Sequence, residues 1–65
     1  MKTVEAQGLG EYQISGAREA EAAAAFEEGY RAACSQSGDG DSMLWELAGL
    51  RRRIMEEYNV SVTLV

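Results

Sequence analysis

One helical stripe in the middle of the chain constrains the fold more than any other feature. Met43, Leu47, Leu50, Ile54 and Tyr58 recur at intervals of four, three, four and four residues. That spacing places them along one face of an α-helix. Three further apolar side chains are expected to widen this face, namely Leu44, Ala48 and Met55. We therefore predict a helix over residues 42–58, with the rest of the chain covering its apolar side.

Two short segments near the N-terminus alternate between apolar and polar residues. Their inward-facing side chains are expected to be Val4, Ala6, Tyr12 and Ile14. Gly8, Leu9 and Gly10 lie between the two segments. Alternation on both sides of a short glycine-rich link is typical of a β-hairpin with a three-residue loop. The sequence therefore predicts a β-hairpin over residues 3–15.

A second helix is predicted over residues 17–36, a stretch rich in alanine. Ser15 or Gly16 is expected to cap its start. The apolar stripe of this helix is expected to comprise Ala22 or Ala23, Phe26, Tyr30 and Ala33. Cys34 lies beside that stripe, and we expect a buried, inert thiol there.

Each predicted helix contains one interior glycine, Gly29 in the first and Gly49 in the second. A glycine inside a helix costs about 1 kcal/mol relative to alanine. Such a glycine often marks the close approach of another backbone. We therefore expect the two helices to approach closely near one or both of these positions.

The end of the chain supplies the remaining elements. Gly38 is expected to end the first helix, and Asp41 or Ser42 to cap the second. The short link between them predicts an antiparallel helical hairpin. Asn59 is expected to stop the second helix in a left-handed conformation. Residues 60–65 alternate and are β-branched, which predicts a last strand with three inward side chains, Val60, Val62 and Leu64.

The predicted fold class is α+β, in the order β-β-α-α-β. A three-stranded, mainly antiparallel sheet carries the helical hairpin on one face and is wet on the other. The last strand runs either antiparallel to the second strand or parallel to the first. With 65 residues, the chain is expected to be a single domain over residues 1–65. Because this length is near the lower limit for an unassisted core, both a monomer and a homodimer are open.

Several classes of protein fit the composition poorly. No signal peptide or membrane span is expected, because no long apolar run occurs. The single Cys34 allows no internal disulfide, which favours the cytoplasm. The chain has no His, the commonest general base and metal ligand. Asp39 and Asp41 begin like a calcium loop, but Leu44 stands where that loop needs glycine. We expect no enzyme activity, no metal and no cofactor.

Arg51, Arg52 and Arg53 form the only basic cluster. Consecutive helical residues point in different directions, so these arginines make no flat patch for phosphates. We expect a solvated helix surface with the ion pairs Arg52–Glu56 and Arg53–Glu57, and likewise a Glu27–Arg31 pair on the first helix. No direct binding of nucleic acid is expected, because the net charge is −5.

Acidic residues dominate the first part of the chain. Residues 1–46 hold nine acidic side chains against three basic ones, a net charge of −6, whereas residues 47–65 hold two against three, a net charge of +1. A surface of this kind is able to mimic nucleic-acid phosphates and to occupy a basic groove of a partner. Solubility alone also explains such a charge. The candidate partner-binding residues are Glu5, Glu11, Glu19, Glu21, Glu27, Glu28, Asp39, Asp41 and Glu46.

Trp45 lies one position off the main stripe of the second predicted helix. It is either part of the core or a partly exposed anchor for a partner.

In size, acidity and economy the chain resembles small phage-encoded anti-CRISPR proteins. The resemblance covers all 65 residues and involves no shared motif, so no site residue is carried over. It implies a non-enzymatic inhibitor in the host cytoplasm that binds a CRISPR effector complex and blocks its recognition of DNA. The alternative is a small structural or regulatory interaction module, including a homodimer formed through the open sheet face or a strand edge.

Overall fold

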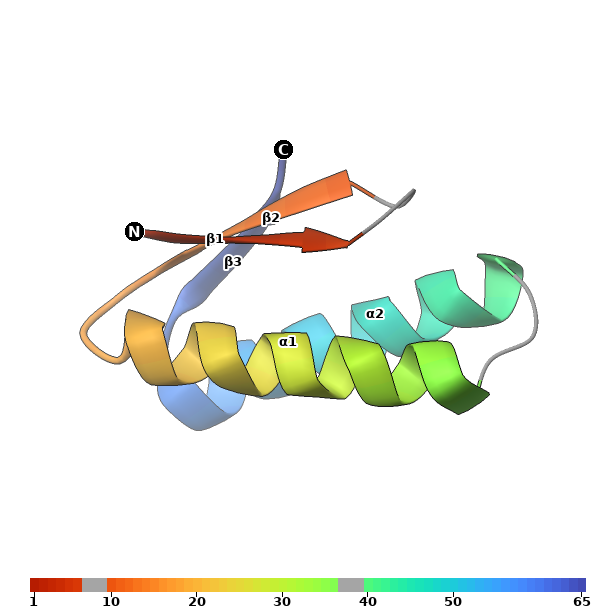
Figure 1. Ribbon diagram of the computed structural model, residues 1–65. Coiled ribbons are helices and arrows are strands. Elements are labelled where there is room, and N and C mark those ends of the chain that lie inside the picture. The colour runs from red at the N-terminus through yellow and green to blue at the C-terminus, as the bar shows by residue number, and fades with distance from the viewer. Residues whose placement is uncertain (7–9, 37–39) are drawn as a thin grey trace.

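The computed structural model describes residues 1–6, 10–36 and 40–65 of the chain. Its elements follow the predicted order β-β-α-α-β (Figure 1). They are β1 (Lys2–Ala6), β2 (Gly10–Ser15), α1 (Glu19–Gln36), α2 (Gly40–Tyr58) and β3 (Ser61–Leu64). The α+β fold class is thereby confirmed. The expected loop residues Gly8 and Leu9, and the link residues Gly38 and Asp39, lie outside the described residues.

The three strands form one open antiparallel sheet in the order β1-β2-β3. Val4 of β1 is the partner of Tyr12 in β2, and Ile14 of β2 is the partner of Val62 in β3. Of the two placements that the sequence allows for the last strand, the antiparallel one beside β2 is right. Val65 continues this ladder, since its N–H donates to the carbonyl oxygen of Glu11 at 2.8 Å.

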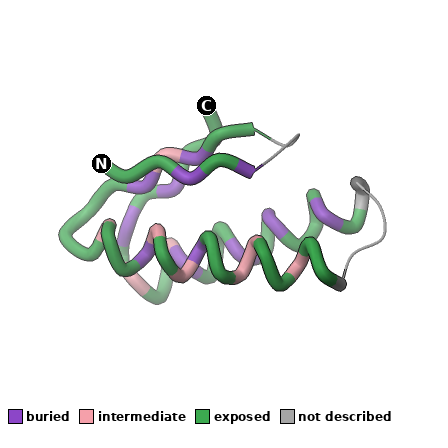
Figure 2. Tube along the Cα trace, viewed as in Figure 1, coloured by how far each residue is buried: buried purple, intermediate pink, exposed green. Residues whose placement is uncertain are grey.

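The helical hairpin covers one face of the sheet, as predicted. α1 packs against α2, β1 and β2, while α2 also packs against β3 (Figure 1). Buried residues line the space between the sheet and the helices, and exposed residues lie on the outer sides of both layers (Figure 2). The buried side chains are Val4, Ala6, Tyr12, Ile14, Ala22, Phe26, Met43, Leu47, Leu50, Ile54, Val60 and Val62.

Phe26 lies at the centre of this core and is fully buried. Its ring is 5.0 Å from the ring of Tyr12, centroid to centroid, with a tilt of 45°. Tilted aromatic pairs at this separation contribute about 0.5–1.5 kcal/mol beyond the area that they bury. The pair joins the middle of α1 to the central strand.

The turn between β2 and α1 shows why the first helix begins later than predicted. Gly16 has φ +152°, and a Cβ there would lie 2.8 Å from Cγ1 of Val60, so glycine is required. The N–H of Glu19 then donates to the carbonyl of Gly16, and the first helical bond runs from Ala22 to Arg18. The helix therefore starts at Glu19 rather than at residue 17, and neither Ser15 nor Gly16 caps it.

The second helix begins earlier than predicted and ends as predicted. Because α2 starts at Gly40, Asp41 and Ser42 lie inside its first turn rather than before it. Asn59 follows α2 with φ 53°, the left-handed conformation expected of it. The last strand is shorter than expected, since Val60 precedes it.

Four apolar side chains lie outside the core, against the sequence-based expectation. Leu44 of α2 is 52% exposed and Leu64 of β3 is 50% exposed. Ala48 and Cys34 are also exposed. Each helix packs against the sheet on one side and against the other helix on another. Its fully buried residues form only a narrow stripe between these contacts. Residues about 100° from that stripe therefore face solvent.

The interior glycines behave differently from one another. A Cβ on Gly29 would lie 2.7 Å from Cδ1 of Leu50, so the expected close packing is confirmed there, with a side chain as the neighbour. At Gly49, the described parts of the chain leave open space within 4 Å of the same position. Among the described residues, the expected close approach at Gly49 is absent.

Candidate functional site

Within β1, β2 and β3, the sheet face that the helices leave uncovered is polar. Side chains alternate along each strand, so the residues between the buried ones point to this outer face. They are Thr3, Glu5, Glu11, Gln13, Ser15, Ser61 and Thr63. Within the described parts of the three strands, this face holds two carboxylates and no basic side chain.

Glu5 and Glu11 are direct partners across the β1–β2 ladder. The carbonyl of Glu11 points to β3, where it accepts a hydrogen bond from Val65. Glu5 and Glu11 therefore form a pair without mutual hydrogen bonds, in which the Cα atoms are about 4.5 Å apart. Like charges at directly opposite positions destabilise a sheet. Neither side chain has an ion-pair partner among the described residues.

The acidic character continues around the β1 edge onto α1. Glu5 lines a hollow of about 360 Å³ together with Glu27, Tyr30 and Arg31. The guanidinium of Arg31 donates to Glu27 at 2.7 Å, which confirms the predicted pair. We call Glu5, Glu11 and Glu27 the acidic edge. Of the acidic candidates whose side chains the structure describes, these are the ones that the fold brings together.

Two further candidates on α1 are held by cations. Glu19 pairs with the amino group of Met1. Glu21 accepts a hydrogen bond from Arg18 at 2.7 Å, and this bond raises the pKa of Arg18. The Arg18 guanidinium also lies over the ring of Tyr58, 4.7 Å from its centroid. These two carboxylates stabilise the start of α1 and its contact with the end of α2.

Two of the remaining acidic candidates, Glu28 and Glu46, lie apart from the acidic edge. Glu28 and Glu46 are exposed on the helices and have no ion-pair partner among the described residues. Asp39 lies outside the described residues, and the backbone of Asp41 lies in the first turn of α2. Glu28 belongs to α1 and Glu46 to α2, and both helices form the layer on the other side of the sheet from its outer face (Figure 1).

The basic cluster on α2 divides into two roles. The Nε of Arg51 donates to the carbonyl oxygen of Val62 in β3 at 2.8 Å, a contact that the sequence did not predict. Arg52 and Arg53 are exposed. Within residues 40–65, Arg52 forms no ion pair with Glu56, and Arg53 forms none with Glu57. The prediction of these two ion pairs is therefore wrong.

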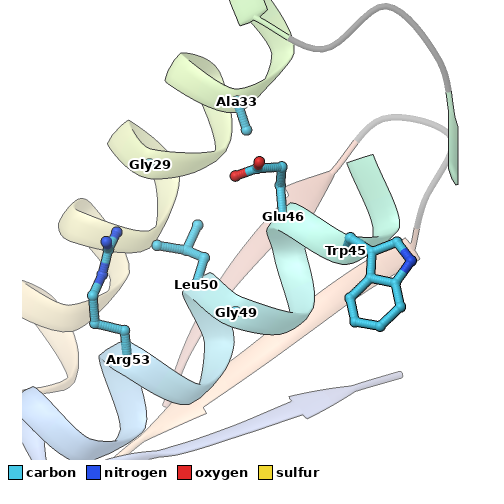
Figure 3. Close-up of a pocket in the computed structure, with 7 residues that line it drawn as sticks. All are labelled: Gly29, Ala33, Trp45, Glu46, Gly49, Leu50 and Arg53. Atoms are coloured by element: carbon cyan, nitrogen blue, oxygen red, sulfur yellow. The ribbon is translucent and has the colours of Figure 1, made fainter. Parts of the chain in front are cut away.

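Trp45 is 81% exposed, so the interpretation as a core residue is wrong. It borders a hollow of about 350 Å³ between the two helices (Figure 3). The hollow is lined by Gly29, Ala33, Trp45, Glu46, Gly49, Leu50 and Arg53. The role of Trp45 as an anchor for a partner stays a prediction.

The described residues contain no group of three or more side chains that could hold a metal ion. None of the described helices is long and apolar enough to cross a membrane. No family model, curated protein or solved structure matches this chain.

Proposed function

We propose that this protein is a non-enzymatic inhibitor that occupies the basic nucleic-acid-binding groove of a partner, such as a CRISPR effector complex, in place of DNA. The observation that carries the proposal is the pairing of Glu5 with Glu11 on the outer face of the sheet. This pair opposes folding, since two like charges lie directly across a strand pair. A role in binding a cationic partner gives a reason for it.

The surroundings of the pair fit a basic groove. Beside the pair, the described strands offer hydroxyl and amide groups, which pair with Arg and Lys side chains, while Val65 next to Glu11 is apolar. Glu27 places a further carboxylate around the β1 edge, where it is paired with Arg31. A groove that closes over this edge would meet carboxylates on both of its walls, and complementary charge would also steer the encounter.

Capture from a bacterial lysate tests the proposal. The wild-type chain is immobilised beside Glu5→Gln/Glu11→Gln and a control, Glu56→Gln/Glu57→Gln, which changes the net charge equally at the end of α2. We expect the wild type and the control to retain a nucleic-acid-binding complex at low salt and to release it as salt rises. The Glu5/Glu11 variant should retain much less. Equal capture by all three chains would contradict the proposal.

The alternative is a small structural or regulatory interaction module, and the exposure of Trp45 favours it. Exposed tryptophans are frequent at the centres of protein interfaces. Trp45 lies on α2, whereas the acidic edge is built from β1, β2 and α1, so the two surfaces are separable by mutation.

A further inference from the structure

Nothing in the described parts of this molecule requires a glycine at position 49. Its backbone is helical, unlike that of Gly10 and Gly16, whose φ angles are positive. Nothing in the described parts of the chain lies within 4 Å of the Cβ that alanine would add there. An alanine at this exposed position would stabilise α2 by about 0.5–1 kcal/mol. The absence of a side chain at Gly49 is therefore useful only in a contact with another molecule.

Trp45 lies one turn before Gly49 on the exposed side of α2. Helical residues are spaced by about 100°, so Trp45 and Arg52 lie on one flank of Gly49, within about 60° of it. The intervals of four and three residues from Trp45 to Gly49 to Arg52 are those of a helix–helix contact stripe. Trp45 is 81% exposed, so this stripe presents a large side chain beside the open space at Gly49.

Glu46 and Arg53 lie on the other flank of Gly49, toward α1. Figure 3 shows both side chains directed to the α1 side of α2, with Trp45 turned the other way. Both are exposed, and neither takes part in the ion pairs of the described residues. The exposed side of α2 thus carries an acid and a base seven residues apart, with glycine between them.

We propose that the exposed side of α2 binds a second copy of this chain, with the two α2 helices antiparallel about a two-fold axis at Gly49. Residues on the same flank meet in such a pair. Glu46 of each copy then pairs with Arg53 of the other, and Trp45 of each copy lies against the guanidinium of Arg52 of the other. The two Gly49 residues allow the backbones to approach at the axis.

The charges of Glu46 and Arg53 favour a second copy of this chain as the partner and an antiparallel orientation of the two α2 helices. A parallel pair would bring opposite flanks together, so Arg53 of each copy would lie beside Arg52 of the other, which repels, and Glu46 would lie beside Trp45 without a cationic partner. The antiparallel pair makes each attractive contact twice, as an isologous interface requires. The acidic edge lies on β1, β2 and α1, so this dimer leaves it exposed, and the inference is independent of the proposed function.

A charge-exchange experiment tests the interface. Sedimentation equilibrium is measured for the wild type, for Glu46→Lys, for Arg53→Glu and for an equimolar mixture of the two variants. We expect the wild type to shift from 7.1 kDa toward twice that mass. Each variant alone places like charges together and should dimerise at least about tenfold more weakly. The mixture restores both attractive pairs in a heterodimer and should recover the wild-type association.

Two further variants examine the axis itself. Gly49→Leu projects into open space in the monomer, so it should fold normally and lose dimerisation. Ala24→Leu, at an exposed position of α1, is the control and should dimerise like the wild type. The proposal is overturned if the wild type stays at 7.1 kDa up to a concentration of about 1 mM, if the mixture fails to associate, or if Gly49→Leu dimerises like the wild type.

Discussion

Glu5 and Glu11 face each other across the β1–β2 ladder, on the side of the sheet that the helices leave bare. Their carboxylates are exposed and have no cationic partner in the described part of the chain. The pair costs stability and offers two adjacent negative charges to a partner. Stability and binding should therefore respond in opposite directions when this pair is changed.

Replacing Glu11 by Lys should make the protein more stable. Glu11→Lys turns a repulsive cross-strand pair into an attractive one, which is worth about 0.5–1 kcal/mol. Urea denaturation monitored by circular dichroism measures the change. Glu56→Lys is the control, since it alters the net charge equally on α2. If Glu11→Lys is no more stable than this control, the two carboxylates do not repel each other in the folded chain.

Gly29→Ala should destabilise the protein by about 1 kcal/mol. The added Cβ would lie 2.7 Å from Cδ1 and 2.9 Å from Cδ2 of Leu50, whose side chain is buried. The strain of overpacking, about 1–3 kcal/mol, exceeds the gain in helix propensity of about 1 kcal/mol. Urea midpoints give the difference. An increase in stability would show that Leu50 moves aside without strain.

Gly49→Ala is the matched substitution and should act in the opposite direction on the monomer. Its Cβ meets no atom of the described chain within 4 Å, so the helix gains about 0.5–1 kcal/mol. The measurement is made at low micromolar concentration, where self-association is weakest. A destabilised monomer would reveal an intramolecular neighbour of Gly49.

Arg51→Met should destabilise the protein by about 1–2 kcal/mol, because it removes a hydrogen bond from a charged donor. Val62 belongs to the edge strand β3, and its carbonyl points away from β2 to the open edge. Without Arg51, the open edge of β3 would be free to pair with another chain. Aggregation, measured by light scattering, should therefore increase. Arg52→Met, on an exposed residue, should change stability by less than about 0.5 kcal/mol. Equal effects of the two substitutions would show that the contact with Val62 contributes nothing.

Strand alternation and the spacing of the α2 stripe were sufficient to predict the fold class and the order of the elements, but not which neighbour the last strand takes in the sheet. Val4, Ala6, Tyr12 and Ile14 face the core as expected, because a period of two leaves each strand only one buried side. The periodicity could not give the width of the buried stripes. Leu44 is apolar and adjacent to the stripe, yet it lies beyond the reach of both the sheet and α1.

The candidate site was predictable only in part. Alternation alone places Glu5 and Glu11 on the outer face, but their direct opposition depends on the hairpin register. The contact from Arg51 to Val62 depends on how closely α2 approaches the sheet edge, which no local pattern encodes. The pairing of Glu19 with the amino group of Met1 likewise joins residues that only the folded sheet brings together.

If the acidic edge occupies a nucleic-acid-binding groove, the protein must compete with DNA for that groove. The affinity of the captured complex for DNA is measured with and without saturating wild-type chain, with Glu5→Gln/Glu11→Gln as the comparison. We expect the wild type to weaken DNA binding at least about tenfold and the variant to have little effect. Unchanged DNA affinity in the presence of bound wild-type chain would contradict the proposed function.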